Sequence, residues 1–409
     1  MAASTLGRTA IRYQMPMPEL TIGGVPMRSG PTRATISRPI QTLRFRPAAS
    51  NADFGRRRRS TKAQDTGMTN VARTRISTST GRGYPRPPVP PFDVVGIGNA
   101  LVDVISHEHD AFLDEHGLRK GIQALVDAPA AERLYAAMGA ASETSGGSAA
   151  NTLAGLASFG GRAAFLGRVA DDQLGALYAH DSDAVGVTFP LAPATDGSPT
   201  GRCLIIVTPD AERTMNTFLG AAAELGPGDI HEDTVGAAGI CYLEGYLFDP
   251  PEAREALAKA VALSHRAGGK VALSLSDPGC VERNGPIILD ALDGVDLLFG
   301  NEDELALLFG TEAGAALDEA AARCEVVAMT RGPEGCVIAR GDERVSAPAA
   351  PVAAVVDTTG AGDLFAAGFL RGFTTGRPLD ECARLGAVAA AEVIAHVGAR
   401  PQVPLSELA

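Results

Sequence analysis

The sequence predicts an α/β fold in which a mostly parallel central sheet is flanked by helices, with a small additional β-sheet. Two features of the 409-residue chain support this prediction. From residue 92 onward, short apolar runs alternate with segments of helical periodicity, which is the pattern of parallel strands connected by helices. Two apolar runs separated only by a turn, at residues 202–208 and 214–219, interrupt this alternation and predict a hairpin outside the main sheet.

The expected elements follow from these patterns in chain order. Strands are expected at residues 93–98, 163–166, 270–276, 295–299, 326–329, 336–339 and 351–356. Helices are expected at residues 151–159, 252–267, 302–309 and 364–370. Because the carboxyl ends of parallel strands meet at one edge of a sheet, polar residues that follow these strands should lie close together.

Residues 1–90 differ in composition from the rest of the chain and are not expected to join the fold. They contain sixteen Lys and Arg but three Asp and Glu, and four of the arginines are consecutive at residues 56–59. An acid-poor segment rich in Arg, Ser, Thr and Pro is typical of disorder or of an organellar transit peptide. A nuclear-localisation signal and a mispredicted start codon are the alternatives. The segment lacks the apolar core of a secretory signal, so we expect a cytoplasmic or organellar (plastid or mitochondrial) protein and not a secreted one.

The remainder of the chain, of which residues 92–405 are expected to form the folded domain, is acidic. It contains 20 Lys and Arg against 45 Asp and Glu, which argues against nucleic acid as a partner. No uninterrupted apolar run approaches the roughly 20 residues that cross a membrane. The six cysteines form no C-x-x-C pair, so we expect ordinary buried thiols in a reducing compartment and no zinc site.

The most informative motif is the segment DTTGAGD at residues 357–363, which joins an apolar run to an apolar helical segment. Glycines at such a turn allow backbone N–H groups to point at an anion, and the helix dipole adds positive potential there. The carboxylate of Asp363 would repel a resting phosphate. We therefore interpret it as a base that takes the proton of a hydroxyl attacking a phosphate. The alternative is that Asp363 only caps the helix.

Two further segments place polar side chains near expected strand ends. Asn99 and Asp103 follow the first strand four residues apart, and such a pair can bind neighbouring sugar hydroxyls. The segment GGSAAN at residues 146–151 brings Asn151 to the start of a helix, where an amide both donates to and accepts from hydroxyl groups. The alternatives are a polar loop pair and an asparagine helix cap.

Two later segments have the composition of a metal or phosphate site. Residues 301–304 (NEDE) follow an expected strand, and a glutamate there would orient water on Mg²⁺. The alternative is that acidic residues favour the first turn of a helix. Residues 330–335 (TRGPEG) follow another strand, and their backbone N–H groups would cradle phosphates. A tight hairpin is the alternative for this segment.

The sequence lacks the motifs of several enzyme classes. The chain contains no G-x-x-x-x-G-K-[ST] phosphate loop, no G-x-S-x-G nucleophile elbow and no paired-His metal motif. The segment Gly96-Ile97-Gly98 resembles the start of a dinucleotide-binding fingerprint, but residue 101 is leucine instead of the third glycine.

Taken in order, these motifs resemble the ribokinase/PfkB family of sugar and nucleoside kinases. Residues 146–175 resemble the N-terminal signature of that family, and residues 357–370 (DTTGAGDLFAAGFL) resemble its C-terminal signature. Asn301 and Glu304 match its N-x-x-E motif, and Thr330, Gly332 and Gly335 match its T-x-G-x-x-G motif. The resemblance covers roughly residues 92–405. It implies a ribokinase-like fold with a small β-sheet lid, built from about residues 105–146 and 196–219, and the use of ATP and Mg²⁺.

The resemblance also implies roles for individual residues. Asp363 would be the catalytic base, and Gly360, Ala361 and Gly362 would form an anion hole for the transferred phosphoryl group. The acceptor would be held by Asn99, Asp103, Gly147, Ser148, Asn151 and Tyr246. The nucleotide would contact Asn301, Glu304, Thr330, Gly332 and Gly335, with Glu304 acting on Mg²⁺ through water. Asp357 would help to bind a monovalent cation such as K⁺.

Within the family, the chain is similar to adenosine kinases. Residues 98–103 (GNALVD) resemble their G-N-P-L-L-D segment, residues 274–278 (SLSDP) resemble N-L-S-A-P, and residues 295–302 (VDLLFGNE) resemble V-D-I-L-F-G-N-E. Arg213 lies where these enzymes carry a phosphate-binding arginine, and Tyr246 lies near a base-stacking aromatic. The resemblance implies adenosine as the acceptor and a monomer or homodimer. The alternatives are a kinase for ribose, fructose or a related monosaccharide, and a non-catalytic nucleoside-binding protein.

Overall fold

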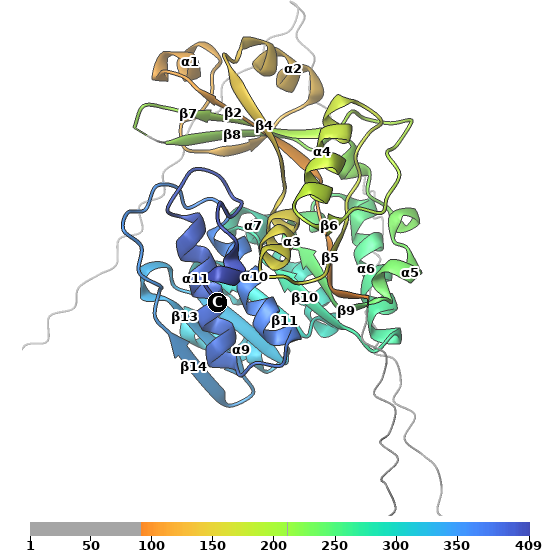
Figure 1. Ribbon diagram of the computed structural model, residues 1–409, viewed down its shortest axis with the longest axis vertical. Helices are drawn as coiled ribbons and strands as arrows, with labels where there is room; N and C mark the ends of the chain where they lie inside the picture. The colour runs from red at the N-terminus through yellow and green to blue at the C-terminus, as the bar shows by residue number, and fades with distance from the viewer. Residues whose placement is uncertain (1–90, 211) are drawn as a thin grey trace, which may run out of the picture. The chain divides into compact units, whose positions relative to one another are not determined.

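The computed structural model describes residues 91–210 and 212–409. The predicted N-terminal extension, residues 1–90, lies outside the described residues. The described part contains a nine-stranded sheet and a separate five-stranded sheet (Figure 1).

The nine-stranded sheet is parallel over most of its width. Its strand order is β14-β13-β12-β11-β10-β9-β1-β5-β6. The pairs β12–β13 and β13–β14, at one edge, are antiparallel, and all the other pairs are parallel. The strands are β1 (Phe92–Ile97), β5 (Ala163–Leu166), β6 (Val187–Thr188), β9 (Ala238–Glu244), β10 (Lys270–Ser274), β11 (Leu297–Asn301), β12 (Val326–Thr330), β13 (Cys336–Arg340) and β14 (Glu343–Ala347). This topology confirms the predicted fold class.

Helices cover both faces of the nine-stranded sheet (Figure 1). The side chains of β1 alternate between the two faces, so that Val95 packs into one core and Val94 into the other. The face of Val95 is covered by α6 (Pro251–Arg266), α7 (Pro278–Ala291), α8 (Glu302–Phe309) and α9 (Ala313–Ala321). The face of Val94 is covered by α3 (Ser148–Ser158), α4 (Gln173–Ala184), α10 (Ala361–Thr374) and α11 (Leu379–Val393). A short helix, α5 (Glu232–Val235), precedes β9.

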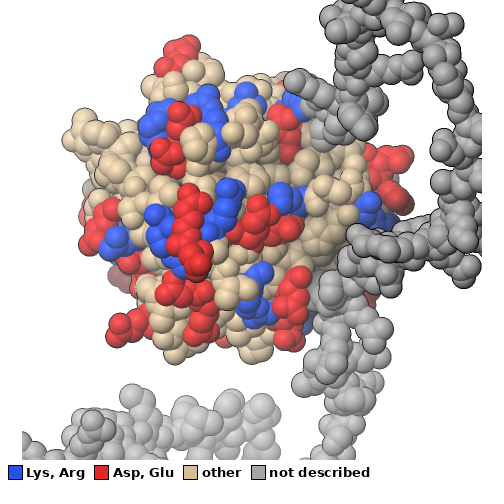
Figure 2. Space-filling view, turned by 90° about the horizontal axis from the view of Figure 1, so that it is seen from below, with Lys and Arg blue, Asp and Glu red and all other residues tan. Residues whose placement is uncertain are grey.

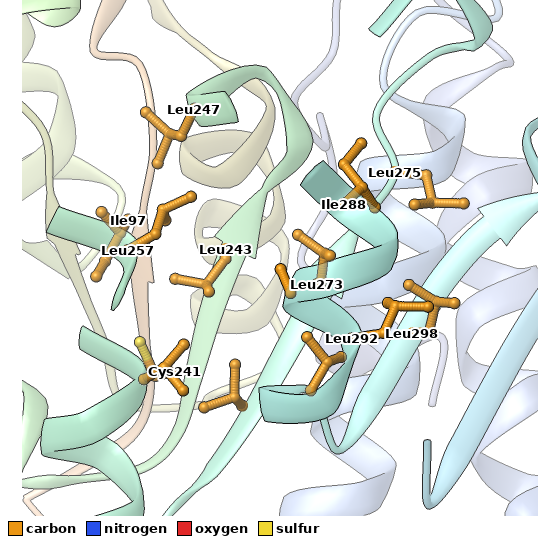
Figure 3. Packing of buried hydrophobic residues seen from close by; sticks show 14 of the residues in the cluster. Ile97, Cys241, Leu243, Leu247, Leu257, Leu273, Leu275, Ile288, Leu292 and Leu298 are labelled. Carbon is orange, nitrogen blue, oxygen red and sulfur yellow. The ribbon is translucent and has the colours of Figure 1, made fainter. Parts of the chain in front are cut away.

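Figure 3 shows part of the first core. Ile97, Leu243 and Leu273 lie on three neighbouring strands, and Leu257 and Ile288 reach them from α6 and α7. All five side chains are at most 2% exposed. This packing holds the carboxyl ends of the parallel strands in fixed positions, because a densely packed interior leaves little room for one strand to slide past another.

The five-stranded sheet has the order β3-β8-β7-β2-β4. Its strands are β2 (Leu101–His107), β3 (Gln123–Leu125), β4 (Ala141–Gly146), β7 (Gly201–Val207) and β8 (Arg213–Phe218). The antiparallel pair of β7 and β8 confirms the predicted hairpin. Val104 and Leu204 on one face of this sheet belong to the same core as Leu113 of α1 (Asp110–Glu115) and Leu134 of α2 (Ala128–Ala137). These two helices cover the face directed away from the nine-stranded sheet (Figure 1).

One predicted strand, residues 351–356, is wrong. The side chains of Val355 and Val356 are 59% and 47% exposed, and the segment is irregular. The place beside β13 is already taken by β14. The Val356 N–H donates to the Ile394 carbonyl (2.8 Å) instead of to a strand. An apolar run does not form a strand unless its backbone groups pair with those of a neighbouring strand.

The cysteines agree with the sequence-based expectation of buried thiols. All six cysteines are buried and free. Among the described residues, no helix is both long enough and apolar enough to cross a membrane. Figure 2 shows one face of the molecule, where Lys and Arg side chains are interspersed with Asp and Glu and form no continuous basic patch on that face.

Candidate functional site

A cavity of about 860 Å³ lies at the carboxyl edge of the nine-stranded sheet. Its lining includes a polar residue at or just beyond the end of five neighbouring parallel strands, namely Asn99, Glu244, Ser274, Asn301 and Thr330. Residues 358–363 of the DTTGAGD motif and several residues of the five-stranded sheet also line it. The prediction that polar residues following separate strands lie close together is therefore confirmed.

Asp363 lies in the first turn of α10, where two helix N-termini meet. Its Oδ1 accepts a hydrogen bond from Ser148 Oγ (2.6 Å), and its Oδ2 accepts one from Asn151 Nδ2 (3.1 Å). Burial raises the pKa of Asp363, and the hydrogen bonds from Ser148 and Asn151 oppose that rise. The residue at the cap position of α10 is Gly360, not Asp363. The helix-cap interpretation of Asp363 is therefore wrong, and its carboxylate faces the cavity.

The N-terminus of α10 presents backbone donors to the same cavity. Gly360, Ala361 and Gly362 all line it. Gly360 has a φ of 78°, and a Cβ atom at this position would lie 2.8 Å from the Cα atom of Ala399, so the turn requires glycine. Within the described residues, the N–H groups of Gly362 and Asp363 donate to no other backbone group. They are available to an anion, as the sequence predicts.

Asp357, the first residue of the motif, is held by four contacts. Its Oδ1 accepts hydrogen bonds from the N–H (3.0 Å) and hydroxyl (2.7 Å) of Thr359. Its Oδ2 accepts one from the Gly398 N–H (2.9 Å) and lies 2.9 Å from Arg213 Nη2. Both oxygens are occupied, and the positive charge beside them is a guanidinium. This arrangement does not fit a monovalent cation bound by Asp357.

Arg213 connects the five-stranded sheet to the loop that precedes α10. It lies at the start of β8 in the five-stranded sheet, and its Nη1 also donates to the Thr359 hydroxyl (3.1 Å). Its side chain is 11% exposed. Arg213 therefore reaches the loop that precedes Gly360, next to the backbone donors of α10. The predicted contact of Arg213 with a phosphate stays a prediction.

Glu244, at the end of β9, was missed by the sequence analysis. Its Oε1 accepts from the backbone N–H and the Nδ2 of Asn99, both at 2.7 Å, and its Oε2 accepts from the Ala149 N–H (2.9 Å). Burial raises its pKa to about 7. The available signal was the apolar run AGICYLE at residues 238–244, which ends in a single charged residue before a glycine.

The Asn99 side chain is 3% exposed, and its Oδ1 is buried with no hydrogen-bond partner among the described residues. Because an unsatisfied buried acceptor is costly, this oxygen favours a ligand that donates a hydrogen bond, such as a hydroxyl group.

Asp103 lies within β2 of the five-stranded sheet, whereas the sequence analysis placed it at the end of the first strand, with a polar loop pair as the alternative. Its side chain lines the cavity, and Gly146 packs so closely against it that an added Cβ atom would lie 2.4 Å from Oδ2. Burial raises the pKa of Asp103 to about 6, while Arg400 and Arg213 oppose that rise. Gly147, the cap residue of α3, also lines the cavity.

Asn301 and Glu304 form a reciprocal helix cap. Asn301 Oδ1 accepts from the Glu304 N–H (2.8 Å), and Glu304 accepts from the N–H (2.9 Å) and Nδ2 (2.8 Å) of Asn301. Burial raises the pKa of Glu304 to about 7. The alternative interpretation, in which acidic residues favour the first turn of a helix, is therefore correct for this segment. Both side chains also line the cavity. Their roles toward a nucleotide and Mg²⁺ stay predictions.

Thr330 and Gly332 line the cavity near the Asn301 cap. They precede an antiparallel hairpin between β12 and β13, so the hairpin interpretation of residues 330–335 is also confirmed. Gly335 is not part of the cavity lining. It has a φ of 88°, and an added Cβ atom would lie 2.0 Å from the Ala347 carbonyl oxygen. The backbone of the turn is a sufficient reason for glycine at this position.

One wall of the cavity is apolar and comes from the five-stranded sheet. It consists of Leu101, Leu125, Cys203, Ile205, Met215 and Leu219. Tyr246 lines the cavity from a 3₁₀ turn, η3 (Gly245–Phe248). Ser276 Oγ holds this turn by accepting from the Gly245 N–H (2.9 Å). Burial and the nearby Asp277 raise the pKa of Tyr246, so its hydroxyl stays protonated. Phe248, in contrast, is buried in the core.

Comparison with known proteins agrees with this geometry. Residues 124–405 match the model of the pfkB family carbohydrate kinases. An adenosine kinase from Sinorhizobium meliloti is 48% identical, covering 78% of this chain and 98% of that one with a TM-score of 0.73. A probable sugar kinase from Rhizobium etli is 46% identical with the same coverage and a TM-score of 0.74.

An Arabidopsis thaliana ribokinase is 31% identical over 253 residues, which are 59% of this chain and 64% of that protein. The family match covers most of the described residues. The alignments with the Rhizobium etli and Sinorhizobium meliloti structures include nearly the whole length of each of those two proteins. The predicted family is confirmed: this chain belongs to the pfkB family of carbohydrate kinases.

Proposed function

We propose that the chain is an ATP- and Mg²⁺-dependent kinase for a primary hydroxyl of a ribose-containing acceptor, with adenosine converted to AMP. One observation carries the proposal. The Asp363 carboxylate lies in the first turn of α10, beside backbone N–H groups that have no partner in the described residues, in a cavity that also has an apolar wall. A base and an anion site are what phosphoryl transfer to an alcohol requires, and an apolar wall suits a nucleobase.

The residues around Asp363 have distinct roles in this proposal. Asp103 and the unsatisfied Oδ1 of Asn99 bind the ribose hydroxyls and bring the primary hydroxyl to Asp363. Ser148 and Asn151 orient the carboxylate, which then accepts the proton of the attacking hydroxyl. The free N–H groups at the start of α10 stabilise the negative charge on the transferred phosphoryl group.

The donors present fit ATP and Mg²⁺. The N–H groups of α10 suit phosphates, and Thr330 and Gly332 line the same cavity. No cluster of three or more His, Cys, Asp or Glu suited to a metal occurs in the described ranges, and Mg²⁺ is commonly held by substrate phosphates and water with one or two carboxylates. Glu304 would serve as such a carboxylate. Bound Mg²⁺ would neutralise charge on the phosphates.

The five-stranded sheet is proposed to act as the lid. Its apolar face forms one wall of the cavity, and Arg213 bridges it to the loop before Gly360. Closure of this sheet over the acceptor would exclude water and suppress hydrolysis of ATP.

The acceptor is tested by a panel. Full-length protein is supplied with ATP and Mg²⁺, and ADP release is measured with adenosine, other nucleosides, ribose and fructose. Selective turnover with adenosine supports the proposal. Turnover with a free sugar alone would retain the phosphotransfer mechanism and reject the nucleoside. Binding of nucleoside without turnover of any acceptor would favour the non-catalytic alternative.

Replacement of Tyr246 by alanine tests the nucleoside directly. Stacking of a base on an aromatic ring contributes about 1–3 kcal/mol, so we expect the KM for adenosine to rise roughly tenfold or more. The control is Tyr135→Ala on α2. Tyr135 is 39% exposed and lies outside the cavity lining, so this change should leave KM unchanged. An unchanged KM in the Tyr246 variant, with a normal melting temperature, would contradict base stacking at this position.

A further inference from the structure

Arg400 reaches the site from the loop that follows α11. Its Nε donates to Asn151 Oδ1 (3.2 Å), and Asn151 Nδ2 donates in turn to Asp363 Oδ2 (3.1 Å). The three residues form a chain of hydrogen bonds that ends on the carboxylate. Sequence analysis gave no indication of this arginine, because it matches none of the motifs discussed above.

The loop that carries Arg400 is anchored on both sides. Before it, the Gly398 N–H donates to Asp357 Oδ2 (2.9 Å). After it, Glu392 Oε1 accepts from the N–H groups of Gln402 (2.8 Å) and Val403 (3.2 Å). These contacts place the guanidinium in the site through the fold itself, since the backbone on either side has little freedom to move.

Carboxyl groups from three elements act electrostatically on the guanidinium, namely Asp103 of β2, Asp181 of α4 and Asp363 of α10. Tyr178 of α4 stays protonated and uncharged, because burial raises its pKa. Burial lowers the pKa of Arg400, and the carboxyl groups oppose that effect, so the arginine remains charged. Its charge in turn opposes the upward pKa shifts of Asp103 and Asp363 that burial causes.

We propose that Arg400 is a positioning residue for Asp363. A guanidinium only donates hydrogen bonds, so the atom of Asn151 that faces it must be the oxygen. This requirement turns the amide nitrogen toward the Asp363 carboxylate, where it donates. At the same time, the positive charge stabilises the ionised form of the carboxylate, which is the form able to accept a proton. The inference deepens the proposed function and rests on Asp363 being its base.

The first test is a pH profile of kcat/KM for the full-length protein and its Arg400→Gln variant. A base must be ionised, so activity falls as the pH drops through its pKa. Loss of the positive charge raises that pKa, and we expect the acid limb of the profile to move to higher pH. We therefore expect kcat/KM of the variant to be lower by about tenfold at pH 5.5 and much closer to wild type at pH 8.5.

Two further variants separate charge from structure. Arg400→Lys keeps the charge and should return the acid limb toward its wild-type position. Arg384→Gln removes an exposed arginine from α11 and should leave the profile unchanged. If the activity of Arg400→Gln falls by the same factor at every pH, the proposal is overturned. A purely structural defect would lower activity without moving the acid limb of the profile.

The second test does not require turnover. The charge of Asp363 also affects the pKa values of Asp103, Glu244, Tyr242 and Tyr246, so the acid limb alone does not isolate this carboxyl. Protein labelled with ¹³C at the Asp carboxyls, with the Asp363 signal assigned by its loss in Asp363→Asn, reports its titration directly. A higher titration midpoint in Arg400→Gln supports the proposal, and an unchanged midpoint overturns it. This readout decides the role of Arg400 even if the acceptor panel shows no kinase activity.

Discussion

Replacement of Asp363 by asparagine is expected to lower kcat by about 10³-fold while leaving acceptor binding nearly unchanged, because an amide cannot take up the proton of the attacking hydroxyl. The two side chains have nearly the same shape. The asparagine oxygen can still accept from Asn151, and its nitrogen can donate to the Ser148 hydroxyl, so both contacts of the native carboxylate have a substitute. The measurements are steady-state kcat, calorimetric binding of the acceptor and the melting temperature.

The matched control is Ser148→Ala, which removes one of the two hydrogen bonds to Asp363 but leaves the carboxylate in place. We expect a much smaller fall in kcat for this variant than for Asp363→Asn. Because asparagine can deamidate back to aspartate, Asp363→Ala serves as a second test of the same role. Turnover close to wild type in either Asp363 variant would reject Asp363 as the base.

Replacement of Gly360 by alanine is expected to damage both stability and activity. The φ of 78° is unfavourable for alanine, and the added Cβ atom would lie 2.8 Å from the Cα and 3.0 Å from the carbonyl oxygen of Ala399. We expect a loss of about 2 kcal/mol or more in the free energy of unfolding. Displacement of the donors of α10 should also lower kcat by about 10²-fold. Thermal unfolding and steady-state kinetics measure the two effects.

Gly362→Ala provides the contrast within the same turn. No atom lies within 4 Å of a Cβ atom built at Gly362, and its φ is not in the left-handed region. We expect an unchanged melting temperature, because alanine is favourable in a helix. Since Gly362 lines the cavity, we expect kcat to fall, because the new methyl group would collide with the phosphoryl group. A Gly360→Ala variant with normal stability and turnover would contradict the role assigned to this turn.

Much of the local structure was predictable from the sequence. The expected strand 163–166 and helix 302–309 have the observed bounds, β5 (Ala163–Leu166) and α8 (Glu302–Phe309). Such elements depend on periodicity and on caps within a few residues, as in the reciprocal pair of Asn301 and Glu304. The strand expected at residues 351–356 was wrong for the opposite reason. Whether an apolar run pairs as a strand depends on which part of the chain the fold brings beside it, and here the Val356 N–H meets the Ile394 carbonyl.

Strand β9 and its terminal Glu244 were missed, although the apolar run at residues 238–244 was a local signal for the strand. No local feature shows which groups the carboxylate of Glu244 binds. Its importance comes from three hydrogen bonds to Asn99 and Ala149, which are 145 and 95 residues away. Asp103 was placed at the end of the first strand because the break between β1 and β2 spans only residues 98–100. The two strands nevertheless belong to different sheets.

By itself, the sequence determined the fold class, the family resemblance and the choice of Asp363 as the candidate base. These depend on alternating strands and helices and on short motifs, which are formed by residues close together in the sequence. Only the tertiary structure decided what surrounds that carboxylate. Ser148 and Asn151 lie 215 and 212 residues from Asp363, and Arg400 lies 249 residues from the Asn151 that it orients. Such contacts arise where separate helices and loops pack at one sheet edge, and no local pattern encodes them.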